Sequence, residues 1–153
     1  MTDVKRESLA DGAVRLSAGK CTFVFRRLLP GTLLVTIVGD DVGQFGSTTV
    51  DEVANEYTRF GKPLSLFFDL RATQGPATPV MEIWTQWFAN HRNNLKRVVL
   101  LVPPESRVLH LSVSIARHLS QTGNLIRICG DTNEFQTAIH DEAPSFKLPT
   151  PSD

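Results

Sequence analysis

The sequence predicts a single α/β domain, built on a mixed and mostly parallel sheet of about five strands with four helices. Three observations lead to this prediction. Two strand-like segments near the N-terminus are joined by the short Pro30-Gly31 turn, which favours a hairpin. Four later segments repeat apolar residues at helical spacing, and apolar runs lie between them. The expected order is β-β-α-β-α-β-α-β-α, with right-handed crossovers between the parallel strands.

The hairpin segments have the composition of β-strands. Residues 21–26 alternate with period two and carry β-branched and aromatic side chains, and residues 32–38 are strongly apolar. Residues 13–17 alternate more weakly and suit a short edge strand. The remaining strands are expected at residues 64–70, 97–102 and 125–129. The first two of these are apolar almost throughout, which is typical of strands that are covered on both faces.

Each predicted helix has an apolar stripe, and we expect these stripes to face the core. The stripes are Val50, Val53, Ala54, Tyr57 and Phe60; then Val80, Ile83, Trp84, Trp87, Phe88 and His91 in a helix at about 79–93; then Val108, Leu111, Ile115 and Leu119 within 105–121; and finally Phe135, Ala138 and Ile139. Thr49 and Glu52 have the spacing of a capping box, and Asp131 is the expected N-cap of the last helix. Gly61 and Gly123 are the expected helix ends.

The two ends of the chain differ from the rest in composition. Residues 1–12 are polar and are expected to form a flexible lead-in, and residues 144–153 form a Pro-rich tail that we expect to be flexible. The folded domain is therefore predicted at 13–143. The N-terminus has no apolar segment of the kind found in secretory signals. Cys21 and Cys129 lie in apolar segments, so we expect buried free thiols and a cytoplasmic location.

Composition argues against several classes of function. The chain has 16 basic and 16 acidic residues and no net charge, so it lacks the electrostatic signature of a nucleic-acid-binding protein. Its apolar runs are far shorter than the roughly 20 residues that a membrane span needs. CxxC and HxxxH spacings are missing, so no metal is expected, and no cofactor motif is found. Residues 39–46 are glycine-containing but match no phosphate-binding pattern, and Asp40 and Asp41 would repel a phosphate.

The order of elements and several phrases resemble the STAS domains, in particular the SpoIIAA-like proteins related to the bacterial sporulation anti-sigma-factor antagonist. The phrases are GTLLVTIVGDD before the first helix, LFFDL at residues 66–70, and the stretches LKRVVLLVPPESRVLHL and IRICGDTNEFQTAI. The resemblance covers about residues 20–142. It implies a non-catalytic regulatory module that binds a partner protein, and it is compatible with a homodimer.

The resemblance also implies a candidate phosphoacceptor. Phosphorylatable members of the family carry Ser or Thr at the start of the helix after the third strand, preceded by Asp and followed by Ser and Gly. Thr78 stands at that position, but Ala77, Pro79 and Val80 occupy the other three. The chain is therefore more similar to members that lack the motif and are often without an assigned activity. From the residues alone, Thr78 before Pro79 is an expected N-cap.

A candidate partner site comprises Asp69, Arg71, Thr73 and Thr78, at the end of a buried strand and in the loop that follows. α/β proteins commonly place functional groups at strand ends. Asp69 either orients the loop at 71–79 or caps that loop's own backbone. Acid–base catalysis would need a second ionisable partner, which the sequence does not supply, and the GxSxG motif of hydrolases is missing. We therefore expect no enzymatic activity.

The second candidate site is the apolar cluster of Met81, Trp84, Trp87 and Phe88. One interpretation places it in the core, like most such stripes. The other places part of it at a dimer interface or in a pocket for an apolar ligand, because three large rings exceed one narrow stripe. The sequence thus favours a regulatory or protein-interaction module. The alternative is a module that binds a small apolar ligand or lipid with the aromatic helix and the sheet face.

Overall fold

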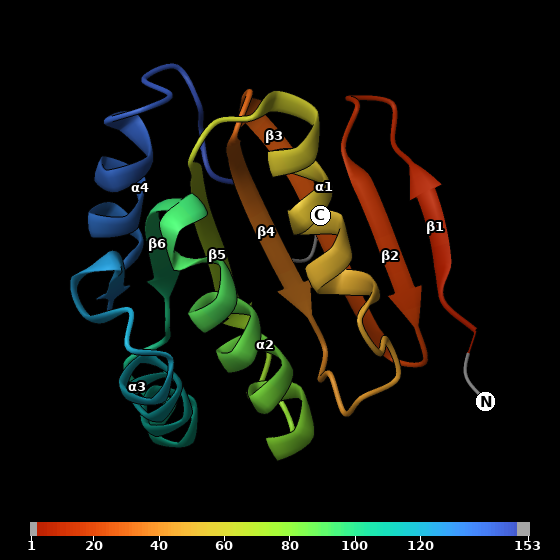
Figure 1. Ribbon diagram of the computed structural model, residues 1–153, viewed down its shortest axis with the longest axis vertical. Helices are drawn as coiled ribbons and strands as arrows, with labels where there is room; N and C mark the ends of the chain where they lie inside the picture. Colours follow the sequence, from red (N-terminus) through yellow and green to blue (C-terminus); the bar gives the residue numbers. More distant parts are fainter. Residues whose placement is uncertain (1–2, 150–153) are drawn as a thin grey trace.

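The computed structural model describes residues 3–149 (Figure 1). Its strands are β1 (Lys5–Ser8), β2 (Val14–Ala18), β3 (Cys21–Leu29), β4 (Thr32–Val38), β5 (Leu64–Ala72), β6 (Leu95–Leu101) and β7 (Ile126–Cys129). Its helices are α1 (Thr48–Phe60), α2 (Thr78–His91), α3 (Arg107–Ser120) and α4 (Thr132–His140). Two short 3₁₀ turns, Arg92–Asn94 and Gly123–Leu125, precede β6 and β7.

All seven strands form one sheet in which the spatial order follows the chain, from β1 to β7. The strands from β1 to β4 pair antiparallel, and those from β4 to β7 pair parallel. The predicted α/β class, the mixed sheet and the four helices are confirmed. The predicted number of about five strands is wrong, and so is the predicted order, because four strands precede α1.

The strand that the sequence did not predict is β1, which lies within the expected lead-in at residues 1–12. Its residues are Lys5, Arg6, Glu7 and Ser8, and it pairs only with β2. It therefore forms the sheet edge, where charged side chains discourage pairing with other chains. A strand with neither face in the core carries no apolar alternation. The weak alternation at residues 13–17 corresponds to β2, which is a regular strand of the sheet and pairs with β3.

The helices are divided unequally between the two faces of the sheet. Each parallel strand lies beside its predecessor in the same direction, so right-handed crossovers bring α1, α2 and α3 to one face. α1 and α2 lie in front of the sheet in Figure 1. α4 follows the last strand and packs on the opposite face, where Phe135 contacts Phe67 with ring centroids 6.0 Å apart. Because the strand order never reverses, the parallel strands have no topological switch point, the usual ligand crevice of open α/β sheets.

Two apolar cores result, one on each face, and alternation along β5 assigns its side chains to them. Leu66, Phe68 and Leu70 belong to the larger core under α1, α2 and α3, whereas Phe67 belongs to the smaller core under α4. The tail contributes to the smaller core as well. Its residues Phe146 and Leu148 pack against that core. The described part of the expected flexible tail thus covers the sheet, and residues 150–153 lie outside the described residues.

The cysteines lie in different cores. Cys21 belongs to the larger core and Cys129 to the smaller one, and both are buried free thiols, as predicted. The sheet separates them, so they do not form a disulfide with each other. Burial raises the pKa of Cys21 to about 12 and also raises the pKa of Cys129. Neither thiol is therefore available as a thiolate nucleophile at neutral pH.

Two of the predicted helix ends are confirmed and two are wrong. Asp131 caps α4 as expected, with its Oδ1 accepting a hydrogen bond of 2.7 Å from the Glu134 N–H. Gly61 ends α1 in the left-handed conformation, also as expected. The capping box of Thr49 and Glu52 is wrong, because the N-cap of α1 is Ser47 and Thr49 lies inside the helix. α3 ends at a left-handed Gln121 rather than at Gly123.

Candidate functional site: a pocket and an exposed helix face

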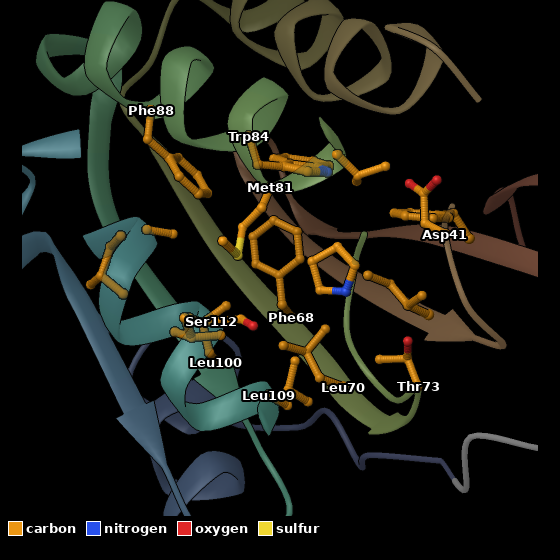
Figure 2. Close-up of a pocket in the computed structure, with 17 residues that line it drawn as sticks. Asp41, Phe68, Leu70, Thr73, Met81, Trp84, Phe88, Leu100, Leu109 and Ser112 are labelled. Carbon is orange, nitrogen blue, oxygen red and sulfur yellow. The ribbon is translucent and has the colours of Figure 1, made fainter. Parts of the chain in front are cut away.

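A pocket of about 100 Å³ lies between α2, α3 and the larger face of the sheet (Figure 2). Its lining is almost entirely apolar. α2 supplies Val80, Met81, Trp84 and Phe88, and the loop before it supplies Pro76. α3 supplies Leu109, Ser112, Val113 and Ala116. The sheet supplies Phe23, Ile37, Phe68, Leu70, Leu100 and Ile126. Asp41 and Thr73 complete the lining from the two loops that follow β4 and β5. An engineered cavity of about 150 Å³ with a similar lining holds benzene, so this volume suits a short alkyl chain.

Aromatic rings in contact with one another form one wall of the pocket. The ring centroids of Phe68 and Trp84 are 5.4 Å apart and the ring planes are nearly perpendicular, while Trp84 and Phe88 are 5.8 Å apart. Met81, Trp84 and Phe88 thus line the pocket, as one of the two sequence interpretations proposed. Trp87 does not line it; it is buried and stacks on His91 at 4.6 Å. The cluster is therefore divided between core and pocket.

The polar end of the pocket is built by two loops that are tied together. The Ala77 N–H donates to the Asp41 carbonyl at 3.0 Å, and the Gln74 N–H donates to Asp40 Oδ1 at 2.8 Å. These bonds hold Asp41 beside the start of α2. Its side chain is buried, its Oδ1 accepts a bond of 3.0 Å from the Gly43 N–H, and burial raises its pKa. Sequence reasoning missed Asp41 because it treated the acidic pair only as a barrier to phosphate.

Asp69 and Arg71 lie on the opposite face of the sheet from the pocket, since they alternate with Phe68 and Leu70 along β5. The Arg71 guanidinium donates to both Asp69 oxygens at 2.9 and 2.7 Å, and the Arg71 N–H donates to Oδ1 at 3.2 Å. Arg71 also donates to the Pro149 carbonyl at 2.8 Å. Asp69 therefore caps its own following backbone and fixes the arginine that holds the tail. A permanently protonated guanidinium is no proton-transfer partner.

The remaining residues of the predicted partner site lie elsewhere. Thr73 is buried at the pocket. Thr78 is exposed and is the first residue of α2, so the expectation that it caps the helix is wrong; the N-cap is Ala77, in an extended conformation. Proline is tolerated throughout the first helical turn, so Pro79 did not determine the cap. The four residues Asp69, Arg71, Thr73 and Thr78 thus do not form one site, and no observation tests phosphorylation of Thr78.

The apolar stripe of α3 does not face the core, contrary to expectation. Val108, Leu111, Ile115 and Leu119 are 72%, 62%, 40% and 61% exposed. The adjacent face of the helix, with Leu109 fully buried, packs on the sheet and lines the pocket instead. Periodicity locates an apolar stripe but does not say what covers it. Because α3 is the last helix on its face of the sheet, no neighbouring element in residues 3–149 covers the stripe (Figure 1).

Within residues 3–149, no group of three or more His, Cys, Asp or Glu side chains is placed to hold a metal ion. None of the helices described is long and apolar enough to cross a bilayer. No protein-family model and no curated protein matches the sequence significantly. The pocket and the stripe of α3, which share one helix, are therefore the features from which a function is inferred.

Proposed function

We propose that this chain is a non-catalytic, STAS-like regulatory module that binds a partner protein through the exposed stripe of α3. The observation that carries the proposal is the exposure of four large aliphatic side chains in a row on one helix, Val108, Leu111, Ile115 and Leu119. Soluble proteins rarely expose such contiguous apolar patches without an interaction. The spacing of three and four residues is that of the anchors by which a helix enters an apolar groove.

The charges of α3 indicate the chemistry of the partner. The ionisable residues within the helix are Arg107, His110, Arg117 and His118, and none is acidic. A partner with an apolar groove rimmed by Asp and Glu would complement this helix in charge. A second copy of the chain would bring the same basic residues together, which disfavours a homodimer through this face. A narrow aliphatic stripe without aromatic or lysine side chains also suits a protein groove better than a lipid surface.

The first prediction concerns this stripe. The double substitution Leu111→Ser and Leu119→Ser is expected to weaken partner binding by about tenfold or more, because truncated apolar anchors dominate such interfaces. Stability should change by less than about 1 kcal/mol, since both side chains are exposed and each surface substitution changes it by at most about 0.5 kcal/mol. The partner would be captured by crosslinking with the wild-type chain and identified, and the Kd of the purified pair would then be measured for both forms.

The matched control is Val42→Ser, which removes an apolar side chain that is 68% exposed but lies in the loop between β4 and α1 rather than on α3. It should leave binding unchanged. Equal affinity for the double variant and the control would contradict the proposal. Sedimentation of the purified chain tests the homodimer: self-association lost in the double variant would identify a second copy as the occupant.

A second candidate function is binding of a small apolar ligand in the α2–α3 pocket, and the pocket itself is the observation that favours it. Substitution of Ala116 with leucine adds three carbons to the wall of a cavity of only about 100 Å³. We therefore expect Ala116→Leu to weaken the binding of hexan-1-ol by about tenfold or more. Tryptophan fluorescence can follow the titration because Trp84 lines the pocket.

The control for this substitution is Ser114→Leu, which makes a similar change on an exposed position of the same helix. It should bind hexan-1-ol like the wild type. If the wild type shows no saturable response to the alcohol, the pocket is not a ligand site. That result would leave the proposal for the exposed stripe standing, because the stripe is tested independently of any ligand.

A further inference from the structure

We propose that the α2–α3 pocket is selective for an apolar ligand whose head group donates hydrogen bonds, above all a primary alkylamine, and that the Asp41 carboxylate receives this head group. The inference rests on the second candidate function above and specifies the chemical class of its ligand. It is carried by the single charged side chain of an otherwise apolar pocket.

The charge of the lining favours a cationic head group. Asp41 is the only ionisable side chain among the described residues that line the pocket; Arg, Lys and His do not occur there. A fatty acid or an alkyl phosphate would bring a negative charge next to this carboxylate, with no cation in the lining to balance it. An alkylammonium would form a charge-assisted hydrogen bond, which is about twice as strong as a neutral one.

The Asp41 carboxylate is incompletely hydrogen-bonded. The residue is only 5% exposed. Its Oδ1 accepts the Gly43 N–H at 3.0 Å, whereas within residues 3–149 its Oδ2 accepts no hydrogen bond and is not fully enclosed by protein. The neighbouring Asp40 differs, because its Oδ1 is used by the Gln74 N–H and by the Thr73 hydroxyl at 3.4 Å. Asp41 therefore retains one carboxylate oxygen without a protein partner in a residue that lines the pocket, whereas Asp40 Oδ1 is engaged in holding the loops.

Burial of the Asp41 carboxylate destabilises the free protein when the group is charged. Removal from water disfavours the charged carboxylate, and the pKa of Asp41 is raised accordingly. The folded state thus loses stability as the pH rises from the ordinary pKa of an aspartate through this raised value, and the penalty is present in full above it. A cationic donor at Oδ2 would offset that penalty. An alcohol would offset it in part, and a carboxylate would increase it.

The shape of the pocket gives the orientation of the ligand. Figure 2 places Asp41 and Thr73 at one end of the pocket and Phe88 at the other, with Met81 and Trp84 between them. The head group would therefore lie at the loop end. The hydrocarbon would extend along the aromatic wall toward Phe88, where burial of its methylene groups would stabilise the complex.

The experiment compares hexylamine, hexan-1-ol and hexanoate, which share a hydrocarbon and differ in head group. Titrations at pH 7 are followed by tryptophan fluorescence and checked by calorimetry. We expect the wild type to bind hexylamine at least about tenfold more tightly than hexanoate, with the alcohol between them. Tighter or equal binding of hexanoate overturns the inference, and this comparison needs no variant to fold.

Two matched substitutions assign the selectivity to one carboxylate. Asp41→Asn keeps an acceptor for the Gly43 N–H and should reduce the preference for hexylamine over the alcohol to about twofold or less. Asp40→Asn removes the neighbouring charge outside the lining and should retain the preference. An unchanged preference in Asp41→Asn overturns the inference. Binding of the alcohol without head-group selectivity overturns it while supporting the pocket as a ligand site; no binding of any probe overturns both.

Discussion

Replacing Gly39 with alanine is expected to destabilise the fold by about 3 kcal/mol or more, since left-handed strain and steric overpacking act together there. Gly39 follows β4 with a φ of +86°, a conformation that residues with a Cβ rarely adopt. A Cβ on this residue would lie 2.1 Å from the carbonyl oxygen of Lys20. The clashing atom belongs to the backbone of the turn between β2 and β3, so no side-chain rotation relieves the contact.

The matched control is Gly12→Ala. Gly12 has the same φ of +86°, but a Cβ there would meet no atom within 4 Å. This variant isolates the cost of the left-handed conformation, which we expect to be about 1–2 kcal/mol. Urea unfolding followed by tryptophan fluorescence gives the free energy of unfolding of all three proteins. Equal destabilisation by the two substitutions would show that the clash with the Lys20 carbonyl adds nothing to the loss of stability in Gly39→Ala.

The substitution at Gly39 should also affect the pocket. The Gly39 N–H donates to the Ala72 carbonyl at 2.9 Å and ties the end of β4 to the end of β5. Asp40 and Asp41 follow directly, and their bonds to Gln74 and Ala77 depend on that junction. A shift of the backbone at Gly39 therefore moves Asp41, so we expect hexylamine binding to weaken in whatever fraction of the variant remains folded.

The sequence predicted best where burial and periodicity agree. The strand at 64–70 was found because it is apolar on both faces, and it is buried on both faces in the structure. The last helix was found because its cap and its stripe both match, with Asp131 bonded to Glu134 N and Phe135 fully buried. In this strand and this helix the local sequence pattern is compatible with only one arrangement, because each buried face has a single sheet to pack against or belongs to that sheet.

Prediction from the sequence failed where a buried and an exposed segment would show the same local pattern. The stripe of α3 has the periodicity of a core-facing helix, yet Val108 and Leu111 are exposed, because whether a stripe is covered depends on the neighbouring elements. β1 has no apolar signal at all, since both of its faces lie outside the core. For the pocket, the aromatic residues of α2 were identified, but Asp41 was not, because it joins the lining only when two loops meet.

Glu56 is a buried charge that the apolar stripe of α1 gave no reason to expect. It is 4% exposed and accepts two hydrogen bonds from the Arg27 guanidinium, at 2.8 and 2.7 Å. It also accepts the Gly31 N–H at 3.0 Å, in the turn that joins β3 to β4. One carboxylate thus fixes α1 to the hairpin. A buried polar cluster of this kind is costly to disrupt, because each partner that loses its bond remains partly removed from water.

We therefore expect Glu56→Ala to lower the free energy of unfolding by about 2–4 kcal/mol. The range extends down to about 2 kcal/mol because the Arg27 side chain is 35% exposed, so the released guanidinium regains hydrogen bonds to water and the cost of losing the pair is smaller. Glu56→Gln should cost less, because its amide oxygen still accepts from Gly31. The control is Glu134→Ala, which breaks an exposed pair with Arg127 at 3.1 Å and should cost less than about 1 kcal/mol. Equal urea midpoints for Glu56→Ala and Glu134→Ala would contradict this expectation. The Glu56 carboxylate would then not hold α1 to the hairpin, and apolar packing by Val50 and Val53 alone would position the helix.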